Sequence, residues 1–159
     1  MIEAGVSTAR AVFAHNSGNV EGWALYAEAE VQAYEPVDGQ LFALQHRMMR
    51  AARAFLDPMV NLGKMTPEAA KSFLMDEVGL SEGMATQEVQ RYSFRSPGQA
   101  TSYFYGYQQL METRQMAELA LRKKFDRKAF NDFVLAQGLV PAKLLRQAVM
   151  EEFVPGRLK

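Results

Sequence analysis

The sequence contains no cysteine and only two histidines, His15 and His46. A chain without thiols cannot form a disulfide scaffold, use a thiolate nucleophile, or bind zinc or an iron–sulfur cluster through cysteine. The two imidazoles are therefore its whole supply of histidine ligands for a metal and of side chains that ordinarily titrate near neutral pH.

The sequence also lacks an excess of either charge and any long apolar run. Eighteen basic and 18 acidic side chains give a formal net charge of zero, so the field that attracts a protein to nucleic acid or anionic lipid is missing. No segment is long and apolar enough to span a bilayer, and the N-terminus, Met1–Gly5, has no basic segment followed by an apolar one. We expect no nucleic-acid partner, no membrane span and no signal peptide; the compartment stays open.

What is present is typical of one globular helical domain. The chain has 159 residues, 48% of them hydrophobic, and alternating runs of β-branched residues are rare, so helix propensity prevails. We predict an all-α fold, a helical bundle of about six to seven helices. The predicted boundaries are a lead-in segment over 1–19, one helical domain over 20–154 and a tail over 155–159.

Capping residues and apolar spacing locate the helices. Asn19, Thr66 and Asp126 are expected N-caps, and Pro155-Gly156 is the expected end of the last helix. The predicted helices cover 20–34, 41–57, 67–79, 86–92, 97–124, 127–137 and 141–153, of which 97–124 is the longest. In the second one, apolar residues at a/d spacing predict a core-facing stripe: Leu41, Leu44, Met48, Ala51 and Phe55.

The most unusual segment is E-G-W-A-L-Y-A-E at residues 21–28. It predicts a helix that is apolar nearly all round, and such a helix is normally buried. Glu21 and Glu28 lie two turns apart at nearly the same angle on it. Buried carboxylates need partners, so these two either pair with arginines such as Arg91 or Arg114, or bind a metal ion, or stay neutral.

Five blocks of sequence follow one another in a distinctive order. They are E-G-W-A-L-Y-A-E at 21–28, R-A-A-R at 50–53 with Asp57, E-V-Q-R-Y at 88–92, P-G-Q-A-T-S-Y at 97–103 with Gly106, and F-D at 125–126 through A-F at 129–130 to Gly138 and Pro141. Together they resemble the C-terminal part of a bacterial family called domain of unknown function 885. The first block also resembles the second motif of gluzincin metallopeptidases, a helix that supplies the third zinc ligand.

This resemblance implies zinc-assisted peptide hydrolysis in a complete family member. Glu21 matches the zinc-ligand glutamate, and Glu28 matches a buried acid behind the ligands. Arg91, Tyr92 and Tyr103 are implied to bind a substrate carboxylate or to stabilise an oxyanion, since guanidinium and phenol groups are suitable donors. Hydrogen bonding within the core is the alternative role for these three residues.

The sequence departs from the family pattern in its histidines. Relatives carry an H-E-x-x-P-G-H-H-like segment upstream of E-G-W, whereas His15 is followed by Asn16-Ser17 and is interpreted as a loop residue. Asn61 and Asn131 stand where many relatives have histidine. One glutamate and one histidine cannot make a catalytic zinc site, so we expect no cofactor in this chain alone, and no activity alone.

Two interpretations of function therefore remain open. The first is the C-terminal helical portion of a zinc metallopeptidase-like protein, acting on peptides only in the complete enzyme, whose relatives are often exported. The second is a stand-alone, non-catalytic helical interaction or oligomerisation module. Both predict an exposed apolar surface that is covered by a second copy or by a missing N-terminal part of the same protein.

Overall fold

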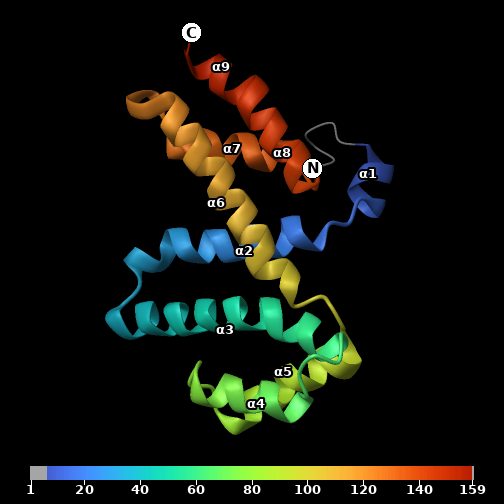
Figure 1. Cartoon of the computed structure of the whole chain (residues 1–159). Helices are drawn as coiled ribbons and strands as arrows, with labels where there is room; N and C mark the ends of the chain where they lie inside the picture. Colours follow the sequence, from blue (N-terminus) through green and yellow to red (C-terminus); the bar gives the residue numbers. More distant parts are fainter. Residues whose placement is uncertain (1–6, 159) are drawn as a thin grey trace. The chain divides into compact units, whose positions relative to one another are not determined.

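The computed structural model describes residues 7–158, and every secondary-structure element in that part is helical. The all-α prediction is therefore confirmed (Figure 1). The chain divides into two compact units, one formed by residues up to Trp23 with those from Gly106 on, the other by Ala24–Tyr105. We call these unit 1 and unit 2. None of the helices within 7–158 is long and apolar enough to cross a membrane.

The helices follow one another along the chain with short connections. They are α1 (Thr8–Phe13), α2 (Ser17–Val31), η2 (Gln32–Tyr34), α3 (Val37–Asn61), α4 (Pro67–Asp76), α5 (Glu82–Gln90), η3 (Arg91–Arg95), α6 (Thr101–Leu121), η4 (Arg122–Lys124), α7 (Arg127–Gln137), α8 (Ala142–Ala148), η5 (Val149–Phe153) and α9 (Val154–Leu158). Two of them, η3 and η5, are π-helical turns. α1 lies in the predicted lead-in. Residues 1–6, on which the prediction of no signal peptide rests, fall outside the described residues.

Two predicted helix caps are confirmed and one is wrong. Thr66 accepts a hydrogen bond from the backbone N–H of Ala69 at 3.2 Å, and Asp126 from that of Ala129 at 2.8 Å. Asn19 does not cap α2, because the helix begins at Ser17 and it is the Asn16 side chain that accepts from the Asn19 N–H at 3.1 Å. Two asparagines three residues apart offer equivalent caps, and the sequence alone does not separate them.

The second predicted helix does not end before Pro58. α3 continues through this proline to Asn61 and is, with 25 residues, longer than α6 with 21, so the prediction that 97–124 holds the longest helix is wrong. A proline inside a helix leaves the carbonyl four residues earlier without its donor. Here the Thr101 hydroxyl donates to the Ala54 carbonyl at 3.2 Å, which replaces the missing bond.

The predicted core stripe of α3 is also wrong. Leu41, Leu44, Met48 and Phe55 are 61%, 44%, 52% and 41% exposed. The buried residues of α3 are Met49, Ala52, Arg53, Leu56 and Asp57. Because this face carries the charged residues Arg53 and Asp57, its low hydropathy predicts exposure to solvent. In the structure it packs in unit 2 with α4, α5 and η3.

A core cluster of unit 2 is built from aliphatic side chains and methionine around Tyr92. Its members are Met49, Ala52, Leu56, Ala70, Leu74, Val78, Leu80, Ala85, Tyr92 and Ala100. Ser81 caps α5 by accepting from the Met84 N–H at 3.4 Å, so this helix begins several residues before the predicted start at Thr86.

Unit 1 contains a close crossing of α2 over α6 (Figure 1). A Cβ atom on Gly106 would lie 1.8 Å from the Gly18 carbonyl oxygen, and one on Gly22 would lie 2.4 Å from the Gly106 carbonyl carbon. Only glycine permits this approach, which explains the glycines of E-G-W and of S-Y-x-x-G together. α2 is not buried all round, since Val20 and Val31 are 40% and 52% exposed.

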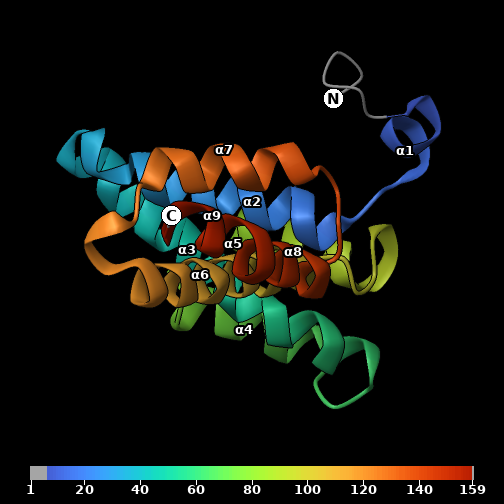
Figure 2. The same cartoon turned by 90° about the horizontal axis from the view of Figure 1, so that it is seen from above.

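In unit 1, α7 lies beside the C-terminal helical segment that contains η5 (Figure 2). Phenylalanine rings pack between them. Phe153 of η5 lies 5.8 Å from Phe130 and 5.4 Å from Phe133 of α7, measured between ring centroids. The predicted end at Pro155-Gly156 is wrong, because α9 runs to Leu158. Pro155 has no backbone N–H to donate. The π-helical turn η5 already interrupts the regular hydrogen-bond ladder just before this proline, so the missing N–H costs little there.

Candidate functional site

Three of the five sequence blocks meet in unit 2. Residues from α3, from α5 with η3, and from the turn that leads into α6 form one connected set of polar side chains, which we call the polar network. Its members are Arg53, Asp57, Glu88, Arg91, Tyr92, Gln99 and Tyr103. Residues separated by up to 50 positions in the sequence are thereby brought into one site.

Arg53 and Glu88 form the buried ion pair of the polar network. Arg53 Nη1 lies 3.3 Å from Glu88 Oε1, and the two side chains are 4% and 14% exposed. The Arg53 guanidinium also stacks over the Tyr103 ring, 4.1 Å from its centroid. A cation held by a carboxylate and an aromatic face is compensated for its loss of water.

Asp57 holds the turn between η3 and α6. Its Oδ1 accepts from the Gly98 N–H and from Asn61 Nδ2, both at 2.8 Å, and its Oδ2 accepts from the Ala100 N–H at 2.9 Å. Asp57 is fully buried, and Gly98 has a φ of +79°, which favours glycine. Charge-assisted bonds to backbone N–H groups are the strong kind, so Asp57 fixes the backbone that carries Gln99 and Tyr103.

Two of the side chains that hold Arg91 in place are Gln99 and Tyr103. One terminal nitrogen of Arg91 donates to Gln99 Oε1 and, at 3.1 Å, to the Tyr103 hydroxyl. The structure therefore brings together two of the three predicted substrate-binding residues. Arg91 lies in the π-helical turn η3, which closes with the Ser96 N–H donating to the Arg91 carbonyl at 3.0 Å.

Tyr92, the third predicted residue, is fully buried. Its hydroxyl lies beside the Glu88 carboxylate without a well-formed hydrogen bond to any described residue. Burial, followed by the negative charge of Glu88, raises the pKa of this hydroxyl far above its usual value. The phenol therefore stays neutral at any ordinary pH, and its surroundings are those of a core tyrosine.

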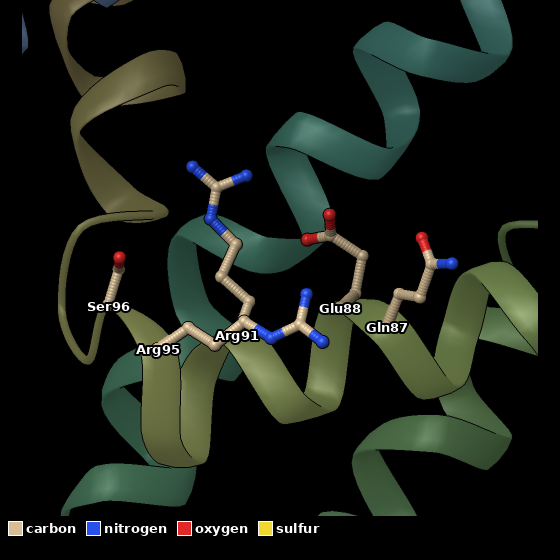
Figure 3. Close-up of a pocket in the computed structure, with 5 residues that line it drawn as sticks. All are labelled: Gln87, Glu88, Arg91, Arg95 and Ser96. Atoms are coloured by element: carbon tan, nitrogen blue, oxygen red, sulfur yellow. The ribbon is translucent and has the colours of Figure 1, made fainter.

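An open hollow of about 280 Å³ lies next to the polar network (Figure 3). It is lined by Gln87, Glu88, Arg91, Arg95 and Ser96. Figure 3 shows Glu88 and Arg91 projecting on the same side of the helical segment, whereas the Arg95 side chain runs along it. Arg95 and Ser96 were not predicted as site residues, because nothing in the sequence signals the π-helical turn that presents them.

The two glutamates of the E-G-W-A-L-Y-A-E helix belong to different units. Glu21 is half-buried on α2 in unit 1. Glu28 pairs with Arg50 in unit 2, at 3.1 Å between Oε2 and Nη2. An arginine partner was one of the predicted alternatives, but the arginine is Arg50 and not Arg91 or Arg114. The surroundings of Glu28 are those of a structural ion pair.

The described donors do not fit a zinc site by themselves. No group of three histidine, aspartate or glutamate side chains within residues 7–158 could hold a metal ion, whereas a catalytic zinc needs three protein ligands. His15 is exposed in the connection between α1 and α2, in agreement with its interpretation as a loop residue. The half-buried His46 packs its ring against Phe42, with centroids 4.2 Å apart.

Asn61 has a structural role in this chain. Its side-chain amide donates to the Asp57 carboxylate, to the Asp57 carbonyl at 2.9 Å and to the Tyr92 carbonyl at 3.2 Å. The amide thus joins α3 to η3 at the edge of the polar network. A group with donors and without a titration near neutrality suits that position.

Comparison with known proteins gives a consistent assignment. Residues 2–149 match the model of a family described as "Bacterial protein of unknown function (DUF885)". The chain is also similar to a "putative lipoprotein" from Colwellia psychrerythraea of known crystal structure, with 31% sequence identity and a TM-score of 0.81. That match covers 88% of this chain and 24% of the Colwellia protein. No curated protein matches significantly. The chain belongs to the DUF885 family of bacterial proteins.

Proposed function

We propose that this chain is the C-terminal helical portion of a zinc metallopeptidase-like protein and is inactive on its own. The observation that carries the proposal is the convergence of three DUF885-like sequence blocks into the polar network of unit 2. Buried polar groups are costly unless they are fully partnered. A family pattern that places seven polar side chains together, three of them buried and four half-buried, favours a functional site over an ordinary core.

The residues of the polar network divide into two kinds in this proposal. Arg91 and Tyr103 carry the donors suited to a substrate carboxylate or an oxyanion. Arg53 and Asp57 position them, the first by stacking on the Tyr103 ring and the second by fixing the turn that leads into α6. Tyr92 supports them from the core, because its hydroxyl is fully buried.

Glu21 is the proposed zinc ligand, and Glu28 the acid behind the ligands, in the longer protein only. The experiment uses the Colwellia protein as the host, because this chain covers 24% of it with a TM-score of 0.81. The matching region of the host is replaced by this chain, and zinc is measured by elemental analysis after dialysis against micromolar zinc. The same measurement is made on the isolated chain, on the chimera with Glu21→Gln, and on a Glu30→Gln control from the same helix.

We expect stoichiometric zinc in the chimera, its loss with Glu21→Gln, its retention with Glu30→Gln, and no zinc in the isolated chain. Hydrolysis of a peptide library should follow the zinc. Zinc that survives Glu21→Gln in the chimera would overturn the role of Glu21. Stoichiometric zinc in the isolated chain would overturn the statement that the chain is incomplete.

A non-catalytic interaction module is the second candidate, and the exposed face of α3, continued by its C-cap residue Leu62, favours it. Leu41, Leu44, Met48, Phe55 and Leu62 are all at least 41% exposed. Successive members lie three, four, seven and seven residues apart, which places them at the a and d positions of a heptad repeat, the seam that one helix presents to another. A second copy of this chain, paired through the same face, is the occupant that this candidate predicts.

Sedimentation velocity tests that candidate. We expect a dimer for the wild-type chain and a monomer for the double variant Leu41→Glu with Met48→Glu. The control is Leu119→Glu, which changes a residue of α6 that is 76% exposed and lies outside the seam. A monomeric wild type, or a dimer that the Leu119 control disrupts equally, contradicts the module.

A further inference from the structure

Unit 1 concentrates positive charge at one end, although the whole chain is neutral. Residues 122–128 contain five basic side chains and one acidic side chain. The Lys124 ammonium group donates to the Leu158 carbonyl at 2.7 Å, which places the end of α9 beside η4 (Figure 1). We call the exposed surface formed there the basic end. Its members are Leu119, Arg122, Lys123, Lys124, Arg157 and Leu158.

The acidic side chains that flank η4 along the chain have other partners. They are Glu118 with Arg114 at 2.7 Å, Asp132 with Lys128 at 2.6 Å, and Asp126 with the Ala129 N–H at 2.8 Å. Within residues 7–158, the four cations of the basic end form no ion pair. The exposed Glu152 of η5 lies five residues before Arg157 and is outnumbered by these cations. A local positive field therefore faces the solvent.

Arg122 occupies a position at which the backbone favours glycine. It directly follows α6 and has a φ of +50°, in the left-handed region where many helices end. Glycine adopts this conformation without steric cost, whereas a residue with a Cβ does not. A helix end that had only to redirect the chain would be more stable with glycine, which favours a role for the charge of Arg122 beyond the fold.

We propose that the basic end docks on the surface of an anionic lipid bilayer. Cations on such a surface bind the lipid phosphates, and apolar side chains among them enter the boundary between headgroups and acyl chains. Leu119 and Leu158, which are 76% and 49% exposed, supply the apolar side chains. A nucleic acid would use the cations without the leucines. The ring of this segment, Phe125, packs against Phe130 at 5.7 Å between centroids and is not presented for base stacking.

Docking of this kind needs neither zinc nor the polar network, so it stands apart from the proposed function and is tested on this chain alone. The probe is sucrose-loaded vesicles of equal parts phosphatidylglycerol and phosphatidylcholine, and vesicles of phosphatidylcholine alone are the comparison. Co-sedimentation is measured at low and at physiological ionic strength, because attraction between exposed charges is screened by salt. Binding of a duplex DNA is measured by fluorescence anisotropy under the same conditions.

We expect binding to the anionic vesicles that weakens as salt rises, and no measurable binding to phosphatidylcholine or to the DNA. A cation near an anionic surface strengthens binding about fivefold, so Lys123→Gln with Arg157→Gln should weaken it about 25-fold. The matched control, Lys64→Gln with Lys143→Gln, removes two exposed positive charges elsewhere and should weaken it less than about twofold. Lys143 lies about 20 Å from Arg157 along the continuous segment of α8, η5 and α9.

Leu119→Ser tests the apolar part of the surface. It leaves every charge in place and should weaken binding to the anionic vesicles about fivefold, because part of the transfer free energy of a leucine side chain is lost. The side chain is largely exposed, so this variant should fold like the wild type, which circular dichroism checks for all variants.

Four results would overturn the proposal. Equal binding to both kinds of vesicle would show attachment through an apolar surface without recognition of charge. An equal loss in the control variant would show that net charge, and not the basic end, determines binding. Binding of duplex DNA that Lys123→Gln with Arg157→Gln abolishes, or vesicle binding unchanged by Leu119→Ser, would show a general polyanion surface. The absence of any binding by the folded chain refutes the proposal directly.

Discussion

Substitution of Gly106 by alanine is the sharpest test of the crossing between α2 and α6 in unit 1. The added Cβ would lie 1.8 Å from the Gly18 carbonyl oxygen and 2.9 Å from the Gly22 Cα. Both are backbone atoms, so no side chain can rotate away and relieve the contact. The two helices must move apart or α6 must bend.

The expected change in the free energy of unfolding is the difference between two opposing contributions. Overpacking of a close contact ordinarily costs about 1–3 kcal/mol, and contact with backbone belongs at the upper end. The alanine recovers about 1 kcal/mol, because glycine inside a helix is that much less favourable. We therefore expect Gly106→Ala to lower the free energy of unfolding by about 2 kcal/mol, which corresponds to a fall in Tm of about 4–8 °C for a chain of this size.

Urea unfolding followed by circular dichroism measures this change. The control is Gly83→Ala in α5, where an added Cβ meets nothing within 4 Å. We expect the control to be neutral or to gain up to about 1 kcal/mol. If Gly106→Ala is as stable as Gly83→Ala, the close crossing does not exist in solution and the explanation of both motif glycines is refuted.

Two further predictions concern the polar network. Asp57→Asn places an amide against backbone N–H donors and should lower the free energy of unfolding by about 2–4 kcal/mol. The control, Asp132→Asn at an exposed position, should lower it by less than about 0.5 kcal/mol. Equal losses would contradict the role of Asp57. The pKa of Tyr92 is raised in the folded chain. Above about pH 10, this hydroxyl loses its proton in the unfolded chain and keeps it in the folded chain. The free energy of unfolding should therefore fall by up to about 1.4 kcal/mol per pH unit. Urea unfolding between about pH 9 and 11 should show a shallower fall for Tyr92→Phe, and equal slopes would contradict the burial of this hydroxyl.

The parts of the fold that depend on local chemistry could be predicted from the sequence. Thr66 and Asp126 cap α4 and α7 as expected, because an N-cap needs only a side-chain oxygen next to the first turn. The end of α3 could not be predicted from Pro58, because its continuation through this proline depends on a distant residue. The hydroxyl that satisfies the Ala54 carbonyl belongs to Thr101, and a partner so far along the chain cannot be inferred from local propensity.

The candidate site could be predicted only in part. The DUF885-like blocks named Arg91, Tyr92 and Tyr103. The structure brings Arg91 and Tyr103 into hydrogen-bond contact, and it buries Tyr92 beside Glu88 at the core side of the same polar network. Their geometry could not be foreseen, because it depends on a π-helical turn and on the turn held by Asp57. The same π-helical turn presents Arg95, which has no motif of its own.

The reversed face of α3 gives a prediction that separates sequence pattern from structure. The a/d spacing places Leu44 in the core, whereas the structure leaves Leu44 44% exposed and buries Leu56 completely. Leu56→Ala should therefore lower the free energy of unfolding by about 2–5 kcal/mol, and Leu44→Ala by less than about 1 kcal/mol. Both substitutions remove the same atoms from the same helix, so helix propensity cancels in the comparison. A larger loss for Leu44→Ala in urea unfolding of a monomeric sample would mean that the heptad stripe is the core face after all.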